Sequence, residues 1–293
     1  PGKIIPSNLP ASNSDANQLW EWAKSSVMHW FGPYEDAMTQ EHKTLFHTTV
    51  SSLLNLNRLM PKTLLDDTLK LEIPLNSKEG FVRQIIGWRE FVRHVHELTD
   101  GFEIESEDIP ARNGAGWEGV WSKSRITPNV LENNVGLPPT YWGQKSGMLC
   151  LDTAVSDVVE TGYAHHIPRL MVLANIGNLL GINPRELTDW FWAMFTDAYD
   201  WVVEPNVLAM GTYAVGDVMT TKPYVSGTPY IKKMGDYCGD CSLHFKKSCP
   251  ISDMYWNFLE ENQIHFAKNH RMAMPMRTLA KRTQQAKDTA REV

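Results

Sequence analysis

Three of the chain's four cysteines fall within one short stretch, and this stretch restricts the possible folds more than any other feature. Cys238 and Cys241 form a C-x-x-C pair, Cys249 follows with a proline directly after it, and Cys150 lies far upstream. Two sulfurs three residues apart can bind one metal centre from a single turn. Four thiolates suit a tetrahedral zinc ion and a four-iron cluster equally well. The pattern therefore favours a metal held by all four cysteines over two disulfides or unrelated buried thiols.

The composition is that of a globular protein with a large core. Of the 293 residues, 42% are hydrophobic and 21% charged, and the length alone is typical of about two domains. No apolar run is long enough to span a membrane, and residues 1–6 do not resemble a signal peptide. We therefore expect a cytoplasmic protein without a membrane partner, whose thiols are free to bind metal.

The first residues predict a connection rather than a folded element. The chain starts without methionine and is rich in Pro, Ser and Asn up to about Ser14. This composition predicts a linker over residues 1–18, with an upstream domain before it and one domain over residues 19–293.

Charge is distributed unevenly along the chain. The net charge is −6, but residues 222–293 carry 12 Lys and Arg against 7 Asp and Glu, a net of +5 that leaves −11 for residues 1–221. The last quarter of the chain is thus expected to present a local basic surface to phosphates or, more simply, an ordinary solvated helical surface.

Hydrophobic residues recur at helical spacing through most of the chain, which predicts an all-α fold. There is no alternation of strands and helices, no G-x-G-x-x-G and no Walker-type loop. Long irregular stretches are expected over residues 99–140, which are rich in Gly and Pro, and from about residue 206 to the cysteines. The expected helices start at about residue 15 and cover 44–60 (closed by Pro61), 80–98, 150–161, 168–180, 184–203 and, last, 252–268.

Three groups of side chains could do more than fill a core. His165 and His166 are adjacent, so one ring could be buried and the other could act as a proton donor near neutral pH. Asp197 and Asp200 are three residues apart, which on a helix points both the same way, either to cap the helix or pair with arginine, or to accept hydrogen bonds from a bound heterocycle or ribose. Trp190 begins an aromatic-rich segment that is either core or a redox-active chain beside a cofactor.

Several runs in chain order are similar to the flavin-binding domain of the photolyase/cryptochrome family, and the resemblance extends from about Trp20 to Arg277. The four-cysteine pattern narrows it to the iron–sulfur bacterial branch, the prokaryotic (6-4) photolyases and related cryptochromes. The runs that carry the resemblance are FGPYEDAM (31–38), LFHTTVS (45–51), RQIIGWREF (83–91), GYAHHIPRLMV (162–172) and DAYDWV (197–202).

The resemblance implies a helical domain that binds FAD and a [4Fe-4S] cluster, in a chain that lacks the family's N-terminal α/β antenna domain. It implies a DNA lyase that uses blue light to repair (6-4) pyrimidine photoproducts, by electron transfer from photoexcited reduced FAD to damaged DNA. The DNA would be single-stranded, or double-stranded with the lesion flipped out. The alternative within the family is a blue-light photoreceptor with little or no repair. Outside the family, the alternative hypothesis is a helical nucleic-acid-binding module with a structural zinc.

The resemblance also assigns roles to individual residues. Arg169 and Asp197 match the pair that packs over the isoalloxazine ring. His166 matches a proton donor on the lesion side. The remaining implied residues are Tyr34, Thr48, Ser51, Gln84, Arg89, Asp200 and Asn206 for FAD; His165 and Tyr224 for the lesion; Trp142 and Trp190 for electron transfer; and Cys150, Cys238, Cys241 and Cys249 for the cluster.

Three features depart from the family's pattern. Phe191 stands where relatives can carry a tyrosine, and phenylalanine is a poor electron-hole acceptor. Val203, with Glu204 beside it, stands where a polar residue usually faces the flavin. Residues 99–137 form a longer connection than is usual in the family.

Overall fold

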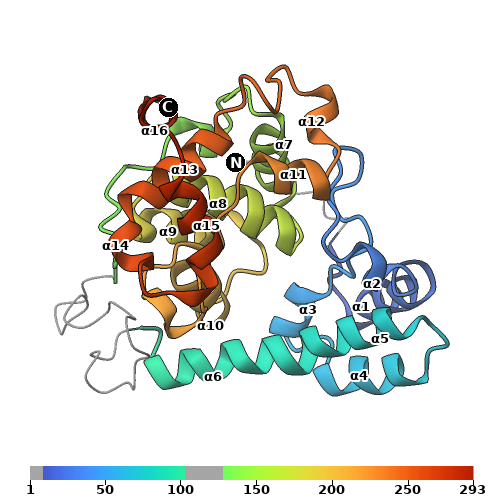
Figure 1. The fold of residues 1–293 in the computed structure, drawn as a ribbon. Coiled ribbons are helices and arrows are strands. Elements are labelled where there is room, and N and C mark those ends of the chain that lie inside the picture. Colours follow the sequence, from blue (N-terminus) through green and yellow to red (C-terminus); the bar gives the residue numbers. More distant parts are fainter. Residues whose placement is uncertain (1–8, 103–127, 293) are drawn as a thin grey trace.

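The structure, a computed structural model, describes residues 9–102 and 128–292. Helices dominate these residues, and their only β-type pairings are two isolated bridges, Met38 with Gly235 and Val135 with Ile182. The predicted all-α fold is therefore confirmed (Figure 1). In the part of the chain described, no helix has the length and apolar character needed to cross a membrane.

The helices fall into an N-terminal and a C-terminal group, joined by one long helix. The N-terminal helices are α1 (Asn13–Trp22), α2 (Phe31–Tyr34), α3 (Ser51–Asn55) and α4 (Pro61–Lys70). The long helix consists of α5 (Leu75–Val82), the π-helical segment η3 (Arg83–Trp88) and α6 (Arg89–Thr99). The C-terminal group comprises α7 (Leu149–Thr161), η6 (Pro168–Ala174), α8 (Asn175–Leu179), α9 (Pro184–Met194), α10 (Asp200–Val203), η7 (Glu204–Gly211), α11 (Thr228–Met234), α12 (Tyr237–Asp240), α13 (Ile251–Glu261), α14 (Gln263–Phe266), α15 (Ala273–Ala280) and α16 (Gln284–Arg291).

The long helix confirms the prediction of a helix over residues 80–98. It runs along the bottom of the molecule in Figure 1, from the N-terminal helices to a place below α10. At one end Phe81 and Ile85 pack into an apolar cluster with Trp20 and Leu53. At the other end Val92 enters a second cluster formed mainly by η7 and the residues after it. One helix thus fixes both groups relative to each other.

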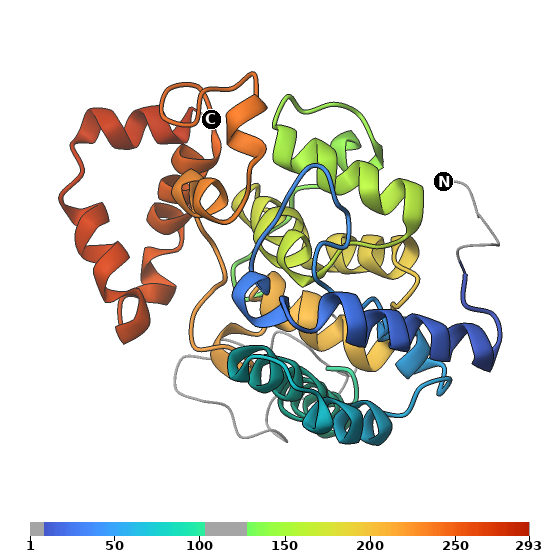
Figure 2. The same cartoon turned by 90° about the vertical axis from the view of Figure 1, so that its right-hand side faces the viewer.

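The largest core lies in the C-terminal group and includes α7, η6, α8, α9 and α13. A segment of the N-terminal group reaches it. Residues 35–50 leave α2, extend to α7 and the α11–α12 region, and return to α3 (blue in Figure 2). Thr39 donates a hydrogen bond to Asp236 at 2.6 Å, and Lys43 lies 3.1 Å from the Asp157 carboxylate. This excursion brings His47 and Thr48 to the junction between the groups.

The expected helix over residues 44–60 is largely wrong, because only Ser51–Asn55 is helical there. Leu45 and Thr49 have positive φ angles of 43° and 55°, which interrupt any helix. Pro61 begins α4 at its first position instead of ending a helix, as proline does when its missing N–H needs no partner.

Other expected boundaries also need correction. Helix α1 begins at Asn13, within the range expected as a linker, because Ser12 and Asp15 form a capping box. Helix α9 ends at Met194, so residues 184–203 do not form one helix, and the chain after Asn206 stays helical to Gly211. The helix expected over 252–268 breaks after Glu261 and is followed by α15 and α16. The long connection expected over residues 99–137 is described only in part, because residues 103–127 lie outside the described residues.

Candidate cofactor and catalytic site

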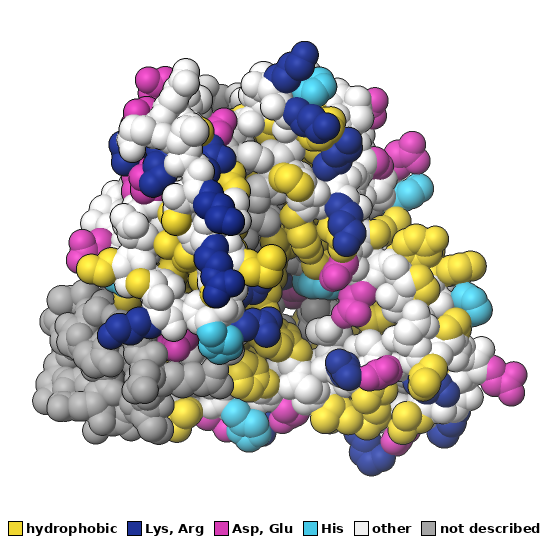
Figure 3. Space-filling model, viewed as in Figure 1, with side chains coloured by type: hydrophobic (Ala, Val, Ile, Leu, Met, Phe, Trp, Pro, Cys, Tyr) yellow, Lys and Arg dark blue, Asp and Glu magenta, His cyan; other side chains and the backbone are white. Residues whose placement is uncertain are grey.

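A cavity of about 480 Å³ lies where the two groups of helices meet the long helix. Figure 3 shows the molecule hollowed on this face, with hydrophobic side chains in the hollow. Much of the wall is apolar, and a small set of polar side chains converges on it, which is the usual character of a ligand site. The polar lining side chains are His47, Thr48, Thr49, Ser51, Gln84, His165, His166, Arg169, Asp197 and Asn206.

The wall contains an ion pair between the buried Asp197 and the partly buried Arg169. The two guanidinium NH groups donate to the two carboxylate oxygens at 2.9 and 3.0 Å, and Ser51 Oγ donates to Asp197 at 2.5 Å. The Arg169 guanidinium also lies 4.2 Å from the centre of the Phe195 ring. Burial alone would raise the pKa of Asp197, but Arg169 and the Ser51 hydroxyl outweigh it and hold the pKa below its ordinary value. The pair therefore keeps a fixed charge distribution at the cavity.

Two amide side chains line the cavity beside this pair. Gln84, on η3, donates to Glu35 at 2.7 Å. Asn206, on η7, accepts from the Trp88 indole at 2.9 Å and donates to the backbone of Val202 at 2.8 Å. Both amides are positioned by neighbours.

Three residues implied for FAD do not line the cavity. Tyr34 is exposed and packs against Trp30 and Phe46. Arg89 stacks over Trp201 at 4.5 Å and donates to Asn55. Asp200 is largely exposed, with the His96 ring nitrogen 3.5 Å away.

The expectation that Asp197 and Asp200 point the same way is wrong. Asp197 precedes α10 and is buried against Arg169, whereas Asp200 is the first residue of that helix. The i, i+3 rule applies only within a helix, and these residues span its start.

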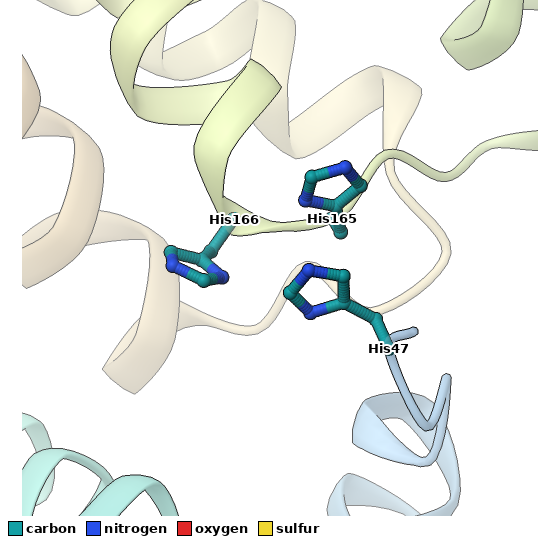
Figure 4. A group of neighbouring side chains, drawn as sticks. All are labelled: His47, His165 and His166. Carbon is teal, nitrogen blue, oxygen red and sulfur yellow. The ribbon is translucent and has the colours of Figure 1, made fainter. Parts of the chain in front are cut away.

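Three histidines meet in the cavity wall, and Figure 4 shows them drawn together from two segments. His165 is 3% exposed and stacks on His47 at 4.1 Å between ring centres, whereas His166 is exposed and lies 3.7 Å from the Asp36 carboxylate. One ring of the adjacent pair is thus buried and the other is accessible, as the sequence interpretation of one buried ring predicted. Burial lowers the pKa of His47 to about 3 and that of His165 to about 2, so both rings are neutral at pH 7.

The implied aromatic residues lie at different depths. Tyr224 lines the cavity and is 37% exposed. Trp190 is buried and lies behind the wall, where its ring meets Phe191, a lining residue, edge-on at 5.3 Å. Trp142 is exposed, and its neighbour Tyr141 meets Trp190 edge-on at 5.2 Å. A run of ring contacts thus links the neighbourhood of Trp142 to the cavity.

Two of the positions that depart from the family's pattern lie in the cavity wall. Phe191 and Val203 both line the cavity, but Glu204 does not. Its carboxylate instead accepts from Arg185 at 2.8 and 3.0 Å and from the Trp192 indole at 3.1 Å. The negative charge of Glu204 is therefore matched within the core.

The four cysteines lie together around a second, smaller cavity. Cys150 comes from the start of α7, Cys238 and Cys241 from α12 and its end, and Cys249 from the turn before α13. All four are free thiols. Burial, with a contribution from the three other thiols, raises the pKa of Cys150 to about 12. Because burial disfavours the charged form of Cys150, a cation beside it would stabilise that form, and four cysteine sulfurs are a donor set that fits a metal centre.

No protein-family model matches the chain. A (6-4) photolyase from Agrobacterium fabrum is 32% identical over 302 residues, which cover 99% of this chain and 55% of that protein. The crystal structure of a bacterial class III photolyase from Agrobacterium tumefaciens superposes with a TM-score of 0.60 at 16% identity, over 99% of this chain and 57% of that one. A cryptochrome from Synechocystis superposes with a TM-score of 0.57 at 12% identity, over 100% of this chain and 59% of that one.

The chain belongs to the bacterial cryptochrome/photolyase family. It spans little more than half the length of these photolyase and cryptochrome relatives. The structural likenesses show the fold, and the cavity lies within that fold.

Sequence reasoning missed two side chains that organise the site. His47 stacks on His165, and Trp88 holds Asn206 through its indole. Both belong to runs that carry the family resemblance, yet neither run indicates which of its side chains point inward. The positive φ of Thr49, which no pattern reveals, contributes to the irregular path that brings His47 to the cavity.

Proposed function

We propose that this chain binds FAD in the large cavity and uses blue light to repair (6-4) pyrimidine photoproducts in DNA. The observation that carries this proposal is the convergence on one cavity of the Arg169–Asp197 pair and the two adjacent histidines. The relative named as a (6-4) photolyase, which aligns with 99% of the chain, supports the proposal. The activity would be that of a DNA lyase.

The cavity residues fit a flavin nucleotide. The cavity volume of about 480 Å³ lies within the usual range for ligand sites, about 300–1,000 Å³, and the apolar wall of the cavity suits a fused ring system. The Arg169–Asp197 pair and Asn206 would hold the ring, and Thr48, Ser51 and Gln84 would hydrogen-bond the rest of the molecule. When bound and reduced, FAD supplies the light-driven electron.

The histidines would manage the proton. His166 is exposed at the cavity, and the Asp36 carboxylate lies 3.7 Å from its Nε2. His165 is neutral and buried beneath it, so it would orient the lesion by hydrogen bonding. Tyr224, partly exposed on the same cavity, would pack against a flipped base.

A basic surface beside the cavity supports DNA as the partner. Lys and Arg side chains gather over α11, α12 and α15 on the face of Figure 3 that holds the hollow. Eight exposed cations of this region make no ion pair with a carboxylate of the described residues: Lys232, Lys233, Lys246, Lys247, Lys268, Arg271, Arg277 and Lys281. Unpaired cations are available for phosphates, so binding would weaken steeply with salt.

The second cofactor of the proposal is a [4Fe-4S] cluster held by Cys150, Cys238, Cys241 and Cys249. The convergence of four free thiols on one cavity supports a metal centre, and the resemblance in cysteine spacing selects the cubane over zinc. The cluster would join α7 to the segment between α11 and α13.

The test is repair of an oligonucleotide that carries one (6-4) lesion by the fully reduced, FAD-loaded protein under blue light. We expect light-dependent recovery of intact pyrimidines by chromatography. The variant His166→Ala should retain flavin and lose repair by about 10²–10⁴-fold, the usual worth of a general acid. His265→Ala, an exposed histidine on α14, serves as the control. Flavin-loaded wild-type protein that gives no turnover would leave the photoreceptor alternative.

A further inference from the structure

The three histidines of Figure 4 form a group in which nitrogen atoms of all three rings lie within 4.8 Å of one another. They come from two segments far apart in sequence. His47 precedes α3, and His165 and His166 precede η6. Two of them are more than nine-tenths buried and the third is exposed at the cavity.

Two ring nitrogens in this group have no hydrogen-bond partner among the described residues. They are His47 Nε2 and His165 Nδ1, and both are shielded from water. Buried polar atoms are nearly always paired, so two orphans in one cluster require an explanation. The proton transfer proposed for His166 involves neither of these two atoms.

The far side of one ring faces a carboxylate. His166 Nε2 lies 3.7 Å from the Asp36 carboxylate. A carbonyl or carboxylate behind a histidine is the usual outer-shell partner of a metal ligand, because it fixes which nitrogen remains free to bind the ion.

We propose that His47, His165 and His166 form a binding site for a divalent transition-metal ion of the Zn²⁺ or Cu²⁺ type. Imidazole nitrogens are preferred ligands of these ions, and three of them leave a fourth position open. The exposed His166 side provides the entry path. His47 and His165 stack with an angle of only 12° between their planes, so His165 must turn for both in-plane lone pairs to reach one ion.

This site is distinct from the cysteine cavity in position and ligand chemistry. The histidines lie in the wall of the larger cavity, and the thiols line a separate one. A sulfur-bound and a nitrogen-bound ion differ spectroscopically, so the two sites can be measured separately in the same protein.

The test uses the full chain with its cofactors bound and the flavin oxidised. Cu²⁺ is the probe. One equivalent of Cu²⁺ should give an electron paramagnetic resonance spectrum with hyperfine splitting from several nitrogens, and titration calorimetry with Zn²⁺ should give a matching one-to-one site. His166→Ala should weaken Zn²⁺ binding at least 10-fold. Asp36→Asn should weaken it by about 10–100-fold, the usual effect of losing an outer-shell carboxylate.

Both variants change exposed residues, so loss of fold does not obscure the result, and flavin content checks it. His47→Phe is a third variant and should remove one nitrogen from the spectrum. His265→Ala, the exposed histidine on α14, should bind like wild type. Equal Zn²⁺ affinity in His166→Ala and wild type, or a Cu²⁺ spectrum of sulfur ligation alone, would overturn the proposal.

Discussion

Asp197 shows how single residues in this molecule combine stability with function. Its carboxylate is buried, accepts from Arg169 and Ser51, and is one of the groups that would orient the flavin. A buried ion pair is costly to break because the remaining partner keeps its charge without compensation. Function and stability therefore depend on the same contact.

We expect Asp197→Asn to lower the free energy of unfolding by about 3–5 kcal/mol at pH 7, as for other broken buried pairs. The folded-state pKa of Asp197 lies below the ordinary value of 3.8, so the pair's contribution is complete above 3.8 and is lost as the pH falls through the folded value. The difference between the variant and wild type should therefore narrow in acid, by up to about 1.4 kcal/mol per pH unit.

Urea unfolding between pH 7 and pH 2.5 measures this difference. The matched control is Asp189→Asn, because the Asp189 carboxylate also pairs with an arginine but is 64% exposed. It should cost less than about 1 kcal/mol. A constant difference for Asp197→Asn across the whole range would contradict the assignment.

At the scale of elements, two glycines have contrasting environments at the long helix from α5 to α6, one within the helix and one packed against it. Gly87, on η3, is exposed and a Cβ there would meet nothing within 4 Å. Gly32, on α2, packs so closely on α5 that a Cβ would lie 2.5 Å from the Ser77 nitrogen. The first glycine is a weakness of the helix, and the second is the reason α2 can approach it.

Gly87→Ala should therefore raise the free energy of unfolding by about 0.5–1 kcal/mol, because alanine loses less backbone entropy in a helix. Gly32→Ala should lower it by about 1–3 kcal/mol through overpacking of α2 on α5. Thermal and urea unfolding of the two variants test the contrast. Destabilisation by Gly87→Ala would mean that this helix does not continue through η3.

Periodicity predicted the elements whose apolar residues face one core, and the helices around Ile85 and Val155 are where they were expected. It failed where packing between distant segments sets the backbone. The path through His47 follows contacts with α7 and α12, and the break after Met194 places Asp197 against Arg169. Such contacts leave no local pattern.

The site was predictable in composition but less so in geometry. The family resemblance supplied Arg169, Asp197 and His166, all of which line the cavity. It did not indicate that Arg89 would stack on Trp201 outside the cavity wall, nor that Glu204 would be paired with Arg185. Side-chain pairing across helices depends on which face each helix presents, and a short helix such as α10 has too few residues to reveal its face.

At the scale of the whole molecule, the four cysteines connect distant parts of the chain. Cys150 and Cys249 enclose α8, α9, α10 and much of the cavity wall between them. A link that closes a loop of about 100 residues restricts the unfolded chain and can contribute on the order of 4–5 kcal/mol. The proposed cluster would thus stabilise the loop that carries Arg169, Asp197 and Asn206 and tie it to the segment before α13.

Cys249→Ser should accordingly lose the cluster and several kcal/mol of stability while retaining flavin at 25 °C. Iron and sulfide analysis of anaerobically purified wild type should give about four irons per chain, and the variant should give almost none. Thermal unfolding followed by flavin release should occur at a lower temperature in the variant, because the loop between α11 and α13 loses its anchor on α7. Ser242→Ala, in the same loop, should keep both the iron and the wild-type unfolding temperature. Zinc in place of iron in the wild type would refute the cubane but keep the four-cysteine anchor, whereas an unchanged unfolding temperature in Cys249→Ser would show that the metal does not stabilise the fold.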